Sequence, residues 1–357
     1  MKRWLIFLAA CGSGSKASID APINASIDAK PQPSADVHLI GRFSQDARFE
    51  WPGSTIATRI DGTSITVKLD DTGQNRFEVW IDGALAPPIV GQQGPHEYTI
   101  ASGLAAGPHD VVIERRTETF FGVTQYLGFP GATFVATPGP SRWIEFVGDS
   151  ITCGYGVLGP DESSCFSNDT EAESRGWASL AARALGAAHS TIAYSGKGVI
   201  RNNGGEPGEL MPALYERTIV EEDATWDFAQ YTPDVVVVDL GTNDFSIGDP
   251  GAPFVTAYEA FLAGIRARYP SAWLVVAQSP MLSDGYPQGA MQRTKAAAYF
   301  QQIVADRANA GDARVVYADI AEQQASDGYG CDYHPSATTH MKMAAALETT
   351  IKSVTGW

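Results

Sequence analysis

The chain has 357 residues, of which 44% are apolar and 18% charged, and it carries a net charge of −16. Its length leaves room for about two domains of ordinary size, and its composition is that of a globular chain rather than a disordered one. Because so acidic a chain repels phosphate and has no basic cluster, nucleic acid is excluded as a partner, whereas neutral polymers are not.

The N-terminus has the pattern of a bacterial lipoprotein signal. Residues 1–11 combine Lys2 and Arg3 with a short apolar run that ends at Cys11, and we favour lipidation of this cysteine over an ordinary signal peptide. Residues 12–36 are rich in Ser, Ala, Asp, Pro and Gly and predict a flexible linker. We therefore expect an extracytoplasmic protein, periplasmic or at the cell surface, that meets the membrane through its lipid anchor only, since no other stretch has the ~18 apolar residues of a span.

Residues 37–137 are typical of antiparallel strands. Apolar residues alternate or run together in short segments between turn signals such as Asp61-Gly62 and Asp82-Gly83. This texture predicts a small β-sandwich, jelly-roll-like in type. Proline and glycine gather over residues 136–142 and indicate a domain boundary.

From Trp143 to the C-terminus, strand-like runs alternate with helical stretches. The clearest helical stretches are residues 175–186, 254–269, 292–311 and 337–354, and the intervening strands include 235–240, 273–279 and 314–320. This alternation predicts that residues 143–357 form a doubly wound α/β domain with a parallel sheet.

The first strand of that domain delivers a candidate nucleophile. An apolar run from Trp143 leads into Gly148, Asp149 and Ser150, and the glycine permits a sharp turn before a helix. The α/β-hydrolase elbow GxSxG would need glycine where Thr152 stands, so a different serine-hydrolase geometry is implied. The alternative is an ordinary strand-turn-helix with a capping serine.

Three later motifs supply the other parts of an acyl-transfer site. Gly196 follows a β-prone run, and its N–H could approach a substrate oxygen closely. Asn243 lies at the end of the buried apolar run of residues 233–244 and offers an amide donor. His334 precedes Pro335 and a capping serine and is the candidate general base. Taken singly, each could instead shape a turn or a helix end.

The ordered set resembles the SGNH, or GDSL, hydrolase family, whose four name-giving positions match Ser150, Gly196, Asn243 and His334. The resemblance implies that Ser150 attacks an ester carbonyl and that His334 takes and returns the proton. It also implies an oxyanion hole formed by the N–H groups of Ser150 and Gly196 and the amide of Asn243.

The third triad member departs from the family pattern. The family usually has an aspartate three residues before the histidine, where Cys331 stands here, and the nearest acid is Asp332. Asp332 could orient the imidazole of His334 from a loop. The alternative is a Ser150–His334 dyad whose ring is held by a backbone carbonyl.

The sandwich narrows the resemblance to carbohydrate esterase family 2, through residues 49–56, VWIDG and RRTET in the N-terminal half together with the four motifs. This implies a cofactor-free esterase that removes O-acetyl groups from polysaccharides such as xylan or glucomannan. A lipid ester, a thioester or O-acetyl peptidoglycan is the alternative substrate, and a carbohydrate-binding lipoprotein with a vestigial hydrolase domain is the alternative class.

One aromatic residue near the motifs is a candidate for sugar contact. Trp226 is the preferred platform for a sugar ring, because sugars stack their apolar faces on aromatic rings, although most large aromatics are buried for packing.

Beyond Cys11, an odd number of cysteines remains, namely Cys153, Cys165 and Cys331. A bridge fits an oxidising compartment, with Cys153–Cys165 as first choice. No metal site is predicted, because no CxxC or HExxH spacing occurs.

Overall fold

The computed structural model of the protein describes residues 36–357. The expected lipoprotein signal with Cys11, and all but the last residue of the expected linker, lie outside this range, so the lipid anchor stays a prediction. Across residues 36–357, no helix combines the length and the apolar character needed to cross a bilayer.

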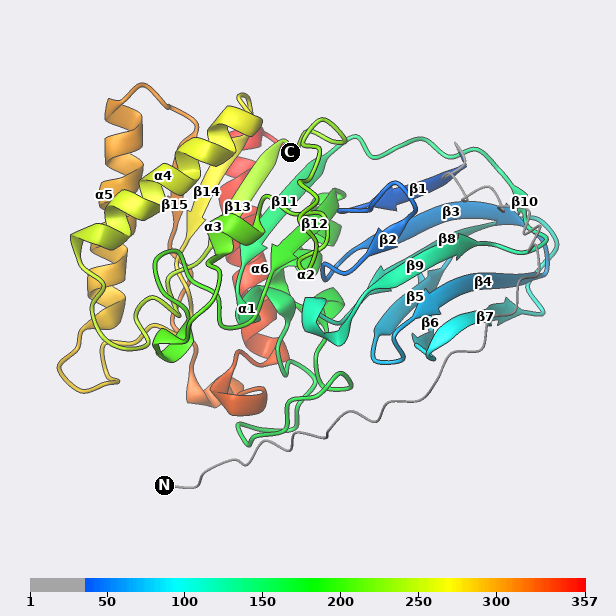
Figure 1. Ribbon diagram of the computed structural model, residues 1–357, viewed down its shortest axis with the longest axis horizontal. Coiled ribbons are helices and arrows are strands. Elements are labelled where there is room, and N and C mark those ends of the chain that lie inside the picture. The colour runs from blue at the N-terminus through cyan, green and yellow to red at the C-terminus, as the bar shows by residue number, and fades with distance from the viewer. Residues whose placement is uncertain (1–35) are drawn as a thin grey trace, which may run out of the picture. The chain divides into compact units, whose positions relative to one another are not determined.

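The chain from residue 37 to residue 134 forms two antiparallel sheets that share one apolar core (blue to cyan-green in Figure 1). The first sheet has the order β1-β3-β8-β5-β6, with β10 also paired to β3, and its strands are β1 Val37–Ile40, β3 Thr55–Asp61, β8 Pro108–Arg115, β5 Arg76–Ile81, β6 Ala84–Val90 and β10 Thr133–Phe134. The second has the order β2-β9-β4-β7, with strands β2 Arg48–Phe49, β9 Thr124–Gly128, β4 Ser64–Asp71 and β7 Gly94–Ser102. The predicted sandwich is confirmed.

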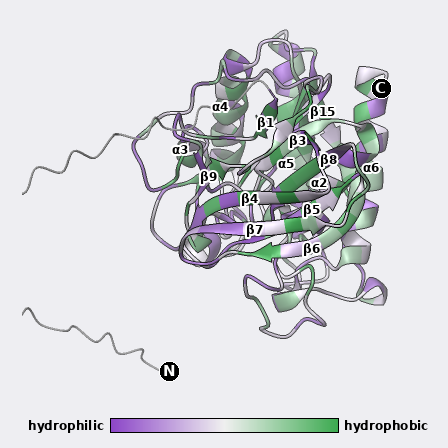
Figure 2. Cartoon of the chain, turned by 90° about the vertical axis from the view of Figure 1, so that its right-hand side faces the viewer, coloured by the Kyte–Doolittle hydropathy of each residue, from purple (hydrophilic) through white to green (hydrophobic). Residues whose placement is uncertain are grey.

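Alternation of side chains explains these strands. In β4, Ile65, Val67 and Leu69 are buried in the sandwich core, and the residues between them point outward. Successive side chains of a strand face opposite sides of the sheet, and Figure 2 shows the resulting mixture of hydrophilic and hydrophobic residues along β4 and β7. Asp82 and Gly83 join β5 to β6 with φ angles of 52° and 76°, as a tight hairpin turn of two left-handed residues requires.

Residues 143–357 form the predicted doubly wound α/β unit around a five-stranded parallel sheet. Its order is β12-β11-β13-β14-β15, with strands β11 Trp143–Gly148, β12 Ala188–Ala193, β13 Val235–Asp239, β14 Trp273–Ala277 and β15 Val315–Ala318. The five residues of β13 are all buried, as expected for a strand covered on both faces.

Helices cover both faces of this sheet. The α-helices are α1 Ser150–Cys153, α2 Trp177–Leu185, α3 Met211–Leu214, α4 Ala252–Arg268, α5 Gln292–Asn309 and α6 Ala337–Thr355. The short 3-10 helices are η1 Thr119–Phe121, η2 Glu173–Arg175, η3 Asn203–Gly205, η4 Ala325–Asp327 and η5 Cys331–Tyr333. Helices α4 and α5 share one core with the sheet, and α2 and α6 share the other (Figure 1).

The strand order fixes where a ligand can bind. β11 pairs with β12 on one side and with β13 on the other, so the chain reverses its winding direction between β11 and β13. In open parallel sheets, ligands bind beyond the carboxyl ends of the strands at such a point. Ser150 follows β11 and Asn243 follows β13, so the topology places both at this position.

A buried ion pair joins the sandwich to the parallel sheet. The guanidinium of Arg42, on the sandwich side, lies 3.6 Å from the carboxylate of Glu145 on β11, and both side chains are fully buried. Glu145 also accepts hydrogen bonds from the hydroxyls of Tyr215 and Tyr231. Removing one partner from such a pair leaves an uncompensated buried charge. The ion pair therefore stabilises the packing of the sandwich against the parallel sheet.

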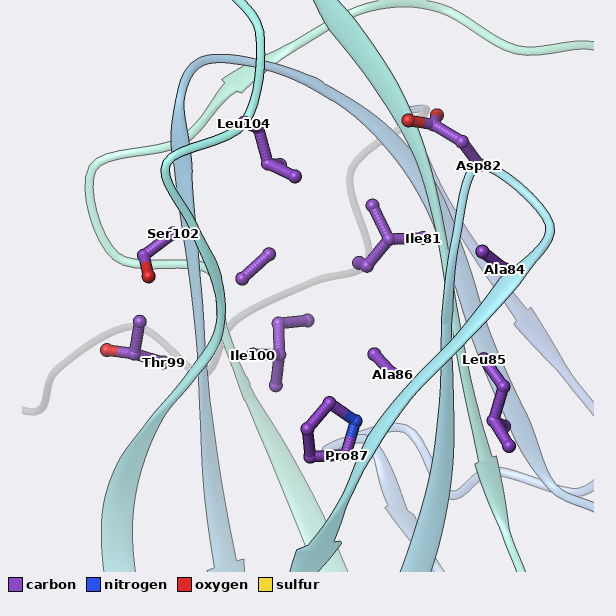
Figure 3. Close-up of a pocket in the computed structure, with 11 residues that line it drawn as sticks. Ile81, Asp82, Ala84, Leu85, Ala86, Pro87, Thr99, Ile100, Ser102 and Leu104 are labelled. Atoms are coloured by element: carbon purple, nitrogen blue, oxygen red, sulfur yellow. The ribbon is translucent and has the colours of Figure 1, made fainter.

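A pocket of about 610 Å³ opens between β6 and β7 at one end of the sandwich (Figure 3). Its walls are mainly apolar side chains such as Ile81, Leu85 and Ile100, with Asp82 and Ser102 at its border. No residue of the parallel sheet lines it, and none of its lining residues is aromatic. The pocket is therefore separate from the carboxyl edge of the parallel sheet.

Candidate active site

The turn after β11 presents Ser150. Asp149 has extended backbone angles, and its carboxylate accepts a hydrogen bond from the N–H of Ile151 at 3.1 Å, which caps α1. A Cβ on Gly148 would lie 2.1 Å from Oγ1 of Thr152, so only glycine fits before the turn. Ser150 itself is 8% exposed.

His334 lies directly against this serine. Its Nε2 is 2.9 Å from Oγ of Ser150, although 184 residues separate the two in sequence. Its Nδ1 is 3.2 Å from the carbonyl oxygen of Cys331. The carbonyl can only accept a hydrogen bond, so Nδ1 carries the proton and Nε2 is left as the acceptor for the serine hydroxyl.

Burial also tunes the charge of His334. The ring stacks on Tyr155, with centroids 4.1 Å apart. Loss of hydration lowers the pKa of His334 to about 4, and nearby carbonyls and the charge of Asp332 only partly oppose this effect. The imidazole is therefore neutral at ordinary pH, as a general base must be.

Asp332 faces away from the imidazole. Its carboxylate accepts hydrogen bonds from the hydroxyl of Tyr155 at 3.0 Å and from that of Ser164 at 2.6 Å. Its backbone is left-handed, with φ of 53°. Of the two arrangements predicted for the histidine, the geometry favours the dyad held by a carbonyl, and Asp332 instead holds the ring on which His334 stacks.

The predicted Cys153–Cys165 bridge is wrong, because Cys165 pairs with Cys331. Cys153 is a free and fully buried thiol in α1, where the helix directs it toward the sandwich instead of the loop that carries Cys165. Cys331 is further fixed by its N–H, which donates to the carbonyl of Gly156 at 3.2 Å. The disulfide thus fastens the residue whose carbonyl holds the imidazole.

The loops that carry the predicted oxyanion donors contact one another. The amide nitrogen of Asn243 lies 3.0 Å from the carboxylate of Asp149 and 2.8 Å from the carbonyl of Lys197, next to Gly196. Gly196 has φ of 80°, which glycine adopts without strain. Within residues 36–357, the N–H groups of Ser150 and Gly196 donate to no other group.

Sequence reasoning missed how Asp244 shapes the Gly196 loop. Its buried carboxylate accepts from the N–H groups of Val199, Ile200 and Arg201, at 2.7 to 3.2 Å. These bonds hold the loop that contains Gly196 against the end of β13. The acid next to Asn243 was visible in the sequence, but only the fold shows which backbone groups face it.

The prediction that Trp226 contacts sugar is wrong. Its side chain is 5% exposed and packs against Tyr231, with ring centroids 5.7 Å apart, and against the guanidinium of Arg42 at 5.6 Å. It therefore belongs to the core beside the buried ion pair and has no free face for a sugar.

The exposed aromatic surface near the site comes partly from the sandwich. Tyr155 stacks on Phe166, with centroids 3.8 Å apart. Phe120 in η1 is 46% exposed, and its ring lies 6.0 Å from those of Phe166 and Tyr194. Phe120 thus lies beside Phe166, which stacks on the tyrosine that contacts the histidine, and beside Tyr194, two residues before Gly196. No sequence pattern predicts that η1 lies beside the hydrolase domain.

Comparison with known proteins agrees with this geometry. Residues 146–342 match the GDSL-like Lipase/Acylhydrolase family, and residues 39–138 match the family Carbohydrate esterase 2 N-terminal. The cellulase/esterase CelE of Acetivibrio thermocellus is 37% identical over 86% of this chain, which spans 38% of the length of that relative. An acetylxylan esterase / glucomannan deacetylase of Cellvibrio japonicus is 29% identical over 95% of this chain and 96% of its own length.

Two solved structures share the whole architecture. A family two carbohydrate esterase from Clostridium thermocellum, in complex with cellohexaose, superposes with a TM-score of 0.85 at 36% identity, covering 90% of this chain and 99% of that one. A carbohydrate esterase family 2 enzyme from Corynascus thermopiles gives a TM-score of 0.82 at 34% identity, covering 90% and 100%.

The fold and these matches define a carboxylic ester hydrolase. The chain belongs to the GDSL-like lipase/acylhydrolase family and, with its N-terminal sandwich, to carbohydrate esterase family 2. The predicted membership in the SGNH, or GDSL, family and in carbohydrate esterase family 2 is thereby confirmed.

The pH dependence of kcat/KM tests the environment of His334. This parameter reports the ionisation of the free enzyme. Because the pKa of His334 is lowered to about 4, activity on p-nitrophenyl acetate is expected to stay constant as the pH falls through 6 and to decline only near pH 4. Circular dichroism at each pH controls for unfolding. An acid limb at the ordinary histidine value of about 6.5 contradicts this environment.

Substitution of Asp332 tests the dyad. An aspartate that orients a catalytic histidine is worth about 10⁴ in kcat. Since the carboxylate of Asp332 bonds Tyr155 and Ser164 instead, Asp332→Asn is expected to lower kcat/KM by less than about tenfold, whereas His334→Ala should lower it by at least about 10³-fold. Equal losses in the two variants would restore Asp332 as a triad member.

Proposed function

We propose that the protein is a serine esterase that removes O-acetyl groups from polysaccharides of the acetylxylan or acetylglucomannan type. The observation that carries this proposal is the 2.9 Å contact between Oγ of Ser150 and Nε2 of His334, in a chain that belongs to a carbohydrate esterase family. A serine hydroxyl is a weak nucleophile until a base takes its proton, and His334 is placed to do so.

In the first half of the proposed reaction, Oγ of Ser150 attacks the acetyl carbonyl while Nε2 of His334 accepts the hydroxyl proton. The free N–H groups of Ser150 and Gly196 stabilise the tetrahedral oxyanion, and each such donor is worth about 3 kcal/mol. The amide of Asn243 joins them when one of its two N–H groups leaves its partner, Asp149 or Lys197, for the oxyanion. The intermediate then collapses. The sugar hydroxyl leaves with the proton from His334, and the acetyl group stays on Ser150.

In the second half, water replaces the sugar. His334 takes a proton from the water, which attacks the acetyl-serine, and the same donors stabilise the second oxyanion. Collapse releases acetate and returns the proton to Oγ of Ser150. Throughout, the carbonyl of Cys331 holds the Nδ1 proton, so that Nε2 remains the atom that exchanges protons.

Three observations support a sugar as the alcohol part of the ester. The relatives include an acetylxylan esterase / glucomannan deacetylase and a structure in complex with cellohexaose. The exposed ring of Phe120, in contact with Phe166 and Tyr194, offers the kind of surface on which the apolar face of a sugar packs. The net charge of −16 favours a neutral polymer over an anionic one.

Acetate release from several polymers tests this proposal. The protein is expected to release acetate from acetylated xylan or glucomannan faster than from O-acetylated peptidoglycan, and to hydrolyse p-nitrophenyl acetate but not long-chain esters. Ser150→Ala is expected to lower every rate by at least about 10³-fold. Turnover by Ser150→Ala near the wild-type rate would refute the mechanism, a preference for long acyl chains would indicate a lipid ester, and glycan binding without hydrolysis would indicate a binding protein.

Phe120→Ala tests the sugar platform separately from the chemistry. Aromatic contacts are worth about 0.5–1.5 kcal/mol, so the variant is expected to raise KM for acetylated polysaccharide by about three- to tenfold. Its KM for p-nitrophenyl acetate, which has no sugar, should not change. Leu85→Ala is the matched control, because Leu85 is also an exposed apolar residue of the sandwich, 53% exposed, but lines the separate pocket. An unchanged KM for polymer in Phe120→Ala would remove this residue from the binding surface.

A further inference from the structure

We propose that Glu118, a residue of the N-terminal sandwich, is a positioning residue for the Gly196 backbone donor of the hydrolase domain. The inference rests on the proposed function, and it makes the sandwich a part of the catalytic apparatus rather than only a neighbouring domain. Neither the family matches nor the four sequence motifs assign a role to this residue.

The carboxylate of Glu118 accepts two hydrogen bonds from Ser195, the residue before Gly196. Oε2 accepts a hydrogen bond from the backbone N–H of Ser195 at 2.7 Å, and Oε1 accepts one from its hydroxyl at 2.5 Å. Both donors of Ser195 are thus used by one side chain that is fully buried. On the other side, the carbonyl of Gly196 accepts from the N–H of Asn203 at 2.8 Å.

These contacts hold the peptide unit whose N–H is the proposed oxyanion donor. The N–H of Gly196 belongs to the peptide unit between Ser195 and Gly196, and this peptide is held from both ends while its N–H donates to no other group within residues 36–357. An oxyanion donor works because its direction is set before the charge develops. Releasing Ser195 would let this peptide rotate, and the loss would appear in the transition state.

The same carboxylate also contacts the helix that begins with Ser150. Sγ of Cys153 lies 3.6 Å from Oε2 of Glu118, and Cys153 is the last residue of α1. Glu118 therefore touches both the segment that carries the nucleophile and the loop that carries Gly196. A single side chain from the sandwich can keep the spacing of these two parts constant.

Glu118 is itself held rigidly. Its N–H donates to the carboxyl of Glu171 at 3.0 Å, and its carbonyl accepts from the guanidinium of Arg115 at 3.0 Å. Burial raises the pKa of Glu118, and burial together with the charge of Glu118 raises the pKa of Glu171. Burying two carboxyl groups costs free energy. An interface that only held the two domains together could be packed with apolar residues instead. The buried carboxyl groups therefore point to a role in holding the active-site loops they contact.

A second buried glutamate provides a matched control. Glu114 of the sandwich also accepts a hydrogen bond from a serine of the hydrolase domain, Ser179, at 2.5 Å, and is 3% exposed. Ser179 lies in α2, which is not part of the site described above. Glu118 and Glu114 are thus both buried and both accept a hydrogen bond from a serine of the hydrolase domain, although Glu114 also pairs with Arg183 and His189. Only Glu118 touches a loop with a proposed oxyanion donor.

The experiment compares kcat and KM for p-nitrophenyl acetate in Glu118→Ala and Glu114→Ala, with thermal unfolding measured for both. Glu118→Ala is expected to lower kcat by about 10²-fold, in the range for loss of one oxyanion donor, at a KM within about twofold of wild type. Glu114→Ala is expected to keep kcat within about threefold even where its unfolding temperature falls as far.

Conservative variants make the result specific. Glu118→Gln should largely restore kcat, because its amide oxygen can accept from the N–H of Ser195 while its NH₂ donates to the serine hydroxyl. Ser195→Ala removes one of the two hydrogen bonds without changing the sandwich, and should lower kcat about three- to tenfold. If Glu118→Ala does not fold, kcat of Ser195→Ala tests the inference by itself.

Two results would overturn the inference: a loss of kcat in Glu118→Ala no larger than in Glu114→Ala, or an unchanged kcat in Ser195→Ala. Either result together with an inactive Ser150→Ala would leave the proposed function intact. Activity that survives in Ser150→Ala would instead remove the proposed function, on which this inference rests.

Discussion

The hydrogen bond between Ser150 and His334 is the contact on which the site depends, and it must be built from residues 184 positions apart. The parallel sheet fixes one partner, because β11 ends where the winding direction reverses. The disulfide Cys165–Cys331 and the carbonyl of Cys331 fix the other. A carbonyl supplies direction but no charge. The imidazole therefore keeps one tautomer without a carboxylate on its ring, and burial keeps it neutral.

Buried carboxylates hold the loops that carry the reacting groups and do not contact the reacting atoms themselves. Asp149, Asp244 and Glu118 are all buried, and each accepts backbone N–H groups of the loops that carry Ser150 or Gly196. Burial, together with the charges of Asp244 and Glu118, raises the pKa of Asp149 to about 7. Such groups are costly to bury unless their hydrogen bonds are made, so their placement holds the loops to one arrangement. Glu118 extends this scheme into the sandwich.

The fold was predictable because it follows from patterns that lie along the chain. Alternation in β4 and the turn at Asp82-Gly83 indicated the sandwich, and the run of four valines in β13 indicated a sheet covered on both faces. Gly196, Asn243 and His334 could also be assigned to one site, because they lie at the ends of strands or before a helix. The carboxyl ends of parallel strands converge wherever the sheet forms.

What could not be predicted depends on contacts between distant segments. Trp226 looked available for a sugar but packs beside Arg42, which comes from the other domain. Cys165 looked close to Cys153 in sequence, yet its loop crosses to Cys331. Phe120 and Glu118 lie in a segment whose direction depends on how the sandwich docks. A single sequence carries no local signal for any of these pairings.

Labelling with a fluorophosphonate tests the central claim most directly, because this reagent reacts with a serine only when a base and oxyanion donors activate it. Stoichiometric reagent should abolish esterase activity, with one label on the peptide that contains Ser150 and none in the His334→Ala variant. Full activity in the presence of excess reagent, or a label on another residue that tracks the loss of activity, would contradict the account.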